Sequence, residues 1–161
     1  MKFLILLNCF ILFLNIAQAQ ESGSDSIPAL NKEIITFVNQ HLKKKVGRGE
    51  CWDLAAEALN TAGAKWNGRY VYGKALDPEK DTIYPGDIIQ FEGVKIKYNK
   101  NNQQVTEKMM HHTAVVYRVL GHGDYELAHQ NTDFSKRKVG ISELNTKYVV
   151  KGKMFFYRPT R

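Results

Sequence analysis

Two stretches of the chain repeat apolar residues at the spacing of an amphipathic helix. Apolar side chains three or four positions apart share one face of a helix. The first stretch carries the stripe Leu30, Ile34, Phe37, Val38, His41 and Leu42. The second carries the stripe Cys51, Leu54, Ala55, Ala58, Leu59 and Ala62. We therefore expect two helices, the second with Cys51 in its first turn and an alanine-rich face against which another element packs closely.

Short apolar runs separated by turn-forming residues fill the rest of the chain, and this pattern predicts strands. The expected strands cover residues 69–73, 88–97, 113–120, 125–131 and 153–158, with a polar loop over 99–108. Helices followed by strands that succeed one another through turns predict an α+β fold. We expect the N-terminal helices to pack on an antiparallel meander.

Residues 1–19 have the pattern of a signal peptide. Lys2 gives a positive start, an apolar run extends to Ile16, and Ala17-Gln18-Ala19 is a small-x-small cleavage pattern. We expect cleavage near Ala19 and export to the periplasm or the outside. Residues 20–29 then form a flexible lead-in and residues 30–161 a single domain. The apolar run is too short to span a membrane, and no later segment is long enough, so we expect no membrane span.

The chain is basic, with 23 lysines and arginines against 16 acidic residues and a formal net charge of +7. Such a surface favours anionic partners such as a cell wall, a membrane surface or nucleic acid, although it is also typical of a solvated exterior. No nucleic-acid-binding motif is present, and export argues against that partner. The sequence does not indicate an oligomeric state.

Cys51 is the one cysteine that remains after residues 1–19 are removed. An unpaired cysteine in an exported protein indicates a reactive thiol, and the alternative is a buried, inert side chain. At a helix N-terminus, free N–H groups and the partial positive charge favour the thiolate. Cys51 is therefore a candidate nucleophile.

A thiol nucleophile needs a base, and the candidates are His111, His112, His122 and His129. His112 shares a strand face with Ala114, whose small side chain would let the alanine-rich helix approach that face. This parity predicts that Cys51 and His112 meet at one edge. Zinc binding by these cysteine and histidine side chains is the alternative. Adjacent histidines point to opposite faces of a strand, so we expect neither a metal nor another cofactor.

A third group must orient the imidazole of the base through its second ring nitrogen. His129 and Asn131 share one face of the next expected strand, and Gln130 points the other way. Parity therefore leaves His129 and Asn131 as alternatives.

Four segments, taken in order, resemble the papain-like CHAP/NlpC cysteine peptidase superfamily: Glu50-Cys51-Trp52 and residues 84–89, 112–116 and 128–131. The resemblance implies a papain-like fold, Cys51 as nucleophile and His112 as base. It implies His129 as the third residue by analogy with NlpC-type members, while Asn131 matches a CHAP position. Many CHAP members have glutamine where this chain has Glu50, so backbone N–H groups are expected to bind the oxyanion.

A second resemblance rests on residues 49–51, 85–91, 112–114 and 156–159. These segments are similar to the cysteine-proteinase-fold domain at the C-terminus of some fungal actin-patch proteins. This resemblance implies the fold rather than an activity.

The first resemblance implies a secreted cysteine hydrolase of amide bonds, a peptidoglycan amidase or endopeptidase, with peptidoglycan or peptide as substrate. The alternative is a catalytically inactive module of the same fold that binds cell wall or protein partners.

Overall fold

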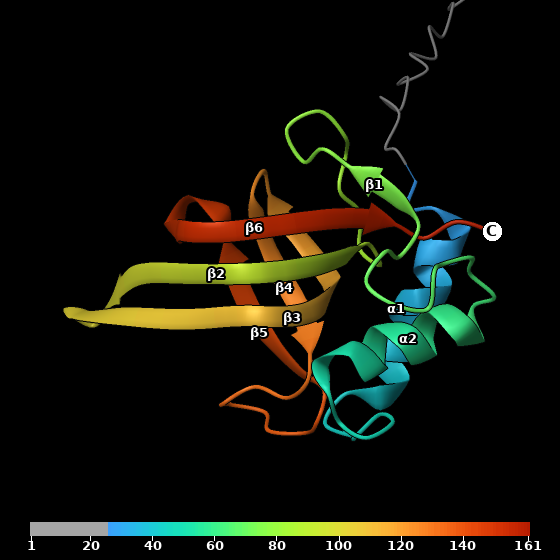
Figure 1. The fold of residues 1–161 in the computed structure, drawn as a ribbon, viewed down its shortest axis with the longest axis horizontal. Coiled ribbons are helices and arrows are strands. Elements are labelled where there is room, and N and C mark those ends of the chain that lie inside the picture. Colours follow the sequence, from blue (N-terminus) through green and yellow to red (C-terminus); the bar gives the residue numbers. More distant parts are fainter. Residues whose placement is uncertain (1–25) are drawn as a thin grey trace, which may run out of the picture.

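The computed structural model describes residues 26–161, so the expected signal peptide over residues 1–19 lies outside the described residues. Two helices and a six-stranded sheet account for most of the described chain (Figure 1). Within residues 26–161, no helix is long and apolar enough to cross a membrane. The elements are α1 (Ala29–His41), α2 (Cys51–Thr61), β1 (Lys74–Leu76), β2 (Ile88–Lys100), β3 (Gln103–Gly121), β4 (Asp124–His129), β5 (Gly140–Asn145), a 3₁₀ turn (Thr146–Tyr148) and β6 (Val149–Arg158).

The sheet is antiparallel and has the strand order β1-β6-β2-β3-β4-β5. The α+β architecture, with N-terminal helices packed on an antiparallel sheet, is as predicted, but β6 lies between β1 and β2, so the sheet is not a simple meander. The expectation of a polar loop over residues 99–108 is wrong, because β2 and β3 extend through this segment. Asn101 and Asn102 form a two-residue turn with φ of 50° and 61°, and strand pairing resumes immediately at Lys100–Gln103. Asparagine tolerates this left-handed backbone, so the hairpin continues through the polar stretch.

The segment at residues 69–73 is a loop rather than the predicted strand, and β1 begins after it at Lys74. The indole Nε1 of Trp52 donates a hydrogen bond to the carbonyl oxygen of Arg69 at 2.7 Å. The side chain of Asn67 accepts from the backbone N–H of Arg69 at 2.8 Å. These contacts satisfy the backbone locally, so no strand pairing is needed there.

The turn before β2 is fixed by Asp87, which is fully buried. Its carboxylate accepts from the backbone N–H of Tyr84 at 2.9 Å and from the Arg158 guanidinium at 2.8 and 3.1 Å. Gly86 has φ of +88° and lies against the backbone of Asn31 in α1. This turn therefore locks α1, the start of β2 and the end of β6 together.

Two apolar cores lie on opposite faces of the sheet. Ile88, Val115 and Ala128 pack with the helices, whereas Ala114 and Phe91 pack in the second core, away from the helices. Figure 1 shows both helices gathered at one end of the sheet. The expectation that Ala114 admits the alanine-rich helix is therefore wrong, because α2 packs on the face that carries Val115.

Candidate functional site

Cys51 is the first residue of α2, as predicted, and its side chain is half-buried. The buried Gln130 holds the preceding loop. Its side-chain amide donates to the carbonyl oxygens of Val46 at 2.9 Å and Glu50 at 2.8 Å, and its oxygen accepts from the N–H of Val46 at 3.2 Å. Asp53 accepts from the N–H of Glu50 at 3.1 Å. The start of α2 is thus fixed on both sides of the thiol.

The thiol meets β3 at its edge rather than on one of its faces. Its Sγ lies 4.0 Å from the carbonyl oxygen of His111, and the N–H of Thr113 is also directed at it. In an antiparallel sheet, the carbonyl of His111 and the N–H of Thr113 point toward the same side of the strand. They face the position on the neighbouring strand that lies opposite His112. Sγ therefore occupies the strand edge opposite His112, just beyond the last residue of β4.

Two adjacent histidines flank this edge from opposite faces of the sheet. His111 lies on the helix side, where its Nδ1 is 2.9 Å from the Glu92 carboxylate and its ring is 4.3 Å from that of Tyr70. His112 lies on the other side, with its ring 6.2 Å from that of Phe91. The two imidazoles thus lie on opposite faces of the sheet, each beside a different partner.

His112 is joined to His129 through a 2.8 Å contact between its Nε2 and Nδ1 of His129. His129 is buried, and its Nε2 lies 2.8 Å from Oγ of Ser142 in β5. Asn131 instead donates from Nδ2 to Oε2 of Glu50 at 2.7 Å. Of the two candidates for the third residue, His129 therefore contacts His112, and Asn131 does not. Within residues 26–161, no hydrogen bond joins Sγ of Cys51 to His112.

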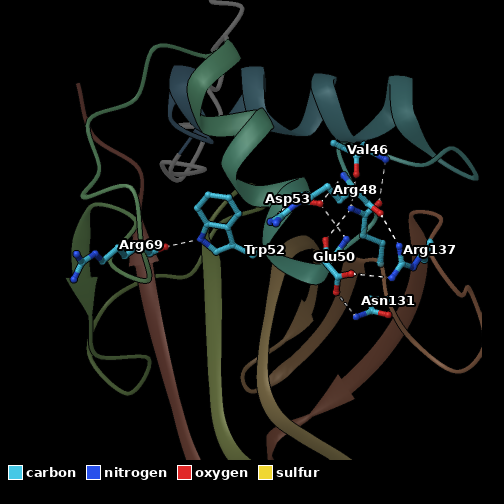
Figure 2. Close-up of polar contacts among 9 residues, drawn as sticks. Val46, Arg48, Glu50, Trp52, Asp53, Arg69, Asn131 and Arg137 are labelled. Atoms are coloured by element: carbon cyan, nitrogen blue, oxygen red, sulfur yellow. Dashed lines mark hydrogen bonds and ion pairs between the residues drawn. The ribbon is translucent and has the colours of Figure 1, made fainter.

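Glu50 directly precedes Cys51, and Figure 2 shows its carboxylate held from two directions, by Asn131 and Arg137. Asn131 donates to one oxygen, and the Arg137 guanidinium donates to the other at 3.1 Å. Arg137 also donates to the carbonyl oxygen of Arg48 at 3.2 Å. A carboxylate held in this way accepts hydrogen bonds and does not donate one to an oxyanion.

Burial raises the pKa of the Cys51 thiol, and the charge of Glu50 adds to the increase. Backbone hydrogen bonds at Thr113, Trp52 and Cys51 lower that pKa, but burial outweighs them. The expectation that the helix N-terminus keeps Cys51 as a thiolate is therefore wrong, because desolvation of the charge dominates. Burial also lowers the pKa of His112 to about 4, and burial together with His112 lowers that of His129 to about 3. The resting site is a neutral thiol beside neutral imidazoles.

Two hollows meet at Asn131, which lines both. One, of about 470 Å³, is lined by Cys51 and His111 together with Trp52 and Tyr70. The other, of about 510 Å³, opens on His112, His129, Phe134 and Ser142. The described residues contain no group of three histidine, cysteine, aspartate or glutamate side chains placed to hold a metal ion.

Four residues that contribute to the site were not among the predicted ones: Gln130, Ser142, Glu92 and Arg137. Strand parity placed Gln130 on the face opposite His112, and the structure shows that this face is the helix side, where Gln130 holds the loop. Ser142 gave no signal because β5 was not predicted as a strand. Glu92 and Arg137 act through pairings across the sheet or between loops, which need the register.

The sequence model of the AIM3/BBC1 cysteine proteinase-fold domain matches residues 28–161. Among solved structures, Ly7917 with the hydrolyzing product of MDP is similar at 16% identity and a TM-score of 0.52, covering 80% of this chain and 62% of that one. Another crystal structure of Ly7917 gives 15% identity and a TM-score of 0.48, covering 79% and 62%. This chain therefore spans less than two thirds of those proteins. No curated protein matches it.

Proposed function

This chain belongs to the family of the AIM3/BBC1 cysteine proteinase-fold domain, and from that premise we propose that it is an exported thiol hydrolase that cleaves amide bonds of peptidoglycan. Cys51 is the nucleophile, His112 is the base, and His129 holds His112 in place.

The single observation that carries this proposal is how the two nitrogens of His112 are used. Nε2 is engaged with His129, which leaves Nδ1 on the side of the ring nearer the strand backbone. The thiol lies at the strand edge opposite the same residue, beside the carbonyl oxygen of His111. Nδ1 is therefore the nitrogen of His112 that is left to act on Cys51.

The chemistry then follows from neutral partners. As Sγ attacks the amide carbonyl, the thiol proton passes to Nδ1 of His112, and the imidazolium returns it to the departing amine. The thioester that remains is hydrolysed by water, which His112 deprotonates in turn. Backbone N–H groups at the start of α2 bind the oxyanion, because the Glu50 carboxylate cannot donate to it.

Peptidoglycan is proposed as the substrate on three grounds. The basic net charge of +7 suits an anionic wall polymer, and the pattern of residues 1–19 suits export. The hollows on either side of Asn131 offer space for chain segments flanking a scissile bond. The bound product of Ly7917 belongs to that protein, and its likeness to this chain supports only the fold.

The test is digestion of purified peptidoglycan by the processed chain, with newly freed amino groups labelled and the fragments identified by mass spectrometry. We expect Cys51→Ala to abolish release and His112→Gln to lower it by about 10²- to 10⁴-fold, the usual contribution of a general base. His122→Ala is the matched control, because His122 is an exposed histidine in a turn and its side chain has no role in this mechanism. Equal release from wild type and Cys51→Ala would refute the proposal.

One observation favours a second candidate, a binding module without activity. The pKa of Cys51 is raised, and the fixed Glu50 carboxylate stands where an oxyanion donor would help. Co-sedimentation with insoluble peptidoglycan distinguishes the two. Sedimentation of the wild type without any released amino groups would favour the module.

A further inference from the structure

The hydrogen bond between Nε2 of His112 and Nδ1 of His129 contains one proton, and either ring can be the donor. If Nε2–H of His112 donates to Nδ1 of His129, neutral His129 carries its own proton on Nε2. If Nδ1–H of His129 donates instead, neutral His112 carries its proton on Nδ1. Only the first arrangement leaves a lone pair on Nδ1 of His112, where the base of the proposed mechanism needs it.

Ser142 lies at the far end of this pair, with its Oγ 2.8 Å from Nε2 of His129. Its hydroxyl can accept from Nε2–H and still direct its own proton into the adjoining hollow, which it lines. His129 is 2% exposed, so an Nε2–H without this partner would be buried and unpaired. In the other tautomer, Nε2 of His129 carries a lone pair, so removing Ser142 leaves only an acceptor without its hydrogen bond.

We propose that Ser142 is a positioning residue that keeps His129 in the Nε2–H tautomer and thereby directs the proton of the His112–His129 hydrogen bond from His112 to His129. The effect matters most when His112 accepts the thiol proton. Imidazolium His112 carries protons on both nitrogens, so Nδ1 of His129 must then be an acceptor. A His129 in the wrong tautomer would place two protons between the rings and oppose that step.

This inference rests on the proposed function for its consequence, but the tautomer can be measured without any activity. Long-range ¹H–¹⁵N spectra of the processed chain at pH 7.5 distinguish protonated from unprotonated ring nitrogens. We expect Nε2–H for His129 in the wild type, a mixture or the Nδ1–H tautomer in Ser142→Ala, and recovery in Ser142→Thr, whose hydroxyl can still accept. Ser135→Ala is the matched control, because the hydroxyl of Ser135 hydrogen-bonds Thr132 and, within residues 26–161, no hydrogen bond joins it to either histidine.

The kinetic readout is alkylation of Cys51 by iodoacetamide and, where digestion is detected, kcat for peptidoglycan release. Ser142→Ala should lower kcat about ten- to a hundredfold with KM unchanged, as expected for the loss of one buried hydrogen bond. Ser142→Thr should restore the rate. A wild-type His129 in the Nδ1–H tautomer, or an unchanged tautomer in Ser142→Ala, would overturn the inference. Absence of digestion in every variant, with the tautomer change present, would instead count against the proposed hydrolase and leave the inference standing.

Discussion

Two histidines held neutral inside the fold should make its stability depend steeply on pH. The pKa values of His112 and His129 in the folded chain are about 4 and about 3, both below the ordinary value of 6.5, because burial disfavours the charged ring. Each group therefore contributes its full stability above pH 6.5, and the contribution is lost as the pH falls from 6.5 toward the folded pKa.

The size of the effect follows from linkage. At pH 5 an unfolded histidine is almost fully protonated, whereas both folded rings remain neutral, so each contributes a loss of about 2 kcal/mol relative to pH 7.5. Together the two rings account for about 4 kcal/mol. The result depends only on both folded pKa values lying below 5, not on their individual magnitudes. It is a large fraction of the stability of a small domain, about 5–15 kcal/mol.

Urea unfolding of the processed chain at pH 7.5, 6 and 5 measures this loss. The matched variant is His112→Gln/His129→Gln, in which neither amide titrates, and its loss across the window should be smaller by about 4 kcal/mol. If the double variant does not fold, His129→Gln alone should reduce the loss by about 2 kcal/mol. His122→Ala, at an exposed turn, should behave as the wild type. Parallel pH dependence of the wild type and the double variant would refute the account of a neutral pair.

Three further predictions concern the start of α2 and the turn before β2. Glu50→Gln removes a charge that raises the pKa of Cys51, so half-maximal iodoacetamide alkylation should move to lower pH; a shift upward would contradict the assignment. Gly86→Ala should lower the free energy of unfolding by about 2–4 kcal/mol in urea, because φ is +88° and the new Cβ would lie 2.5 Å from a backbone oxygen of α1. Arg158→Met strips the buried Asp87 carboxylate of its cation and should cost about 3–5 kcal/mol by the same measurement; a loss below 1 kcal/mol would show that the pair is dispensable.

Periodicity was sufficient for the helices, because each carries a stripe that packs on one core. It placed the start of α2 at Cys51 correctly. It failed where the backbone finds partners that leave no apolar pattern. The hairpin through Asn101 and Asn102 is polar on both sides of its turn, and the 69–73 loop is held by the Trp52 indole and an asparagine side chain. Strand pairing can continue in a polar stretch, and side chains can satisfy a loop, so neither outcome is visible in hydropathy.

For the site, strand parity left two candidate partners for His112, of which one contacts it, and the expected helix-covered face was wrong. His129 shares a face with His112, as alternation predicts, and the two rings are in contact. Alternation fixes only which side chains lie together, however, and not which face the helix covers. That choice depends on the packing of Ile88, Val115 and Ala128 against the helices, which is a property of the assembled sheet. The thiol consequently approaches His112 from the strand edge.

The electrostatics at the start of α2 explain why the thiol is neutral despite its position. A helix N-terminus favours an anion, but two carboxylates already lie at the N-terminus of α2. Asp53 accepts hydrogen bonds from the N–H groups of Arg48 and Glu50. The charge of Glu50 acts on the Cys51 thiol and raises its pKa. Arg48 and Arg137 pair with those carboxylates rather than with the thiol. A preformed thiolate is thus disfavoured, and in the proposed mechanism reactivity comes from proton transfer to a base that is itself kept neutral. The depressed pKa of His112 makes it a weak base, so in the proposed mechanism a negative charge on the substrate near this ring would favour the transfer by stabilising the imidazolium. In the proposed mechanism, the reactivity of Cys51 therefore depends on what a substrate brings to the two hollows beside it.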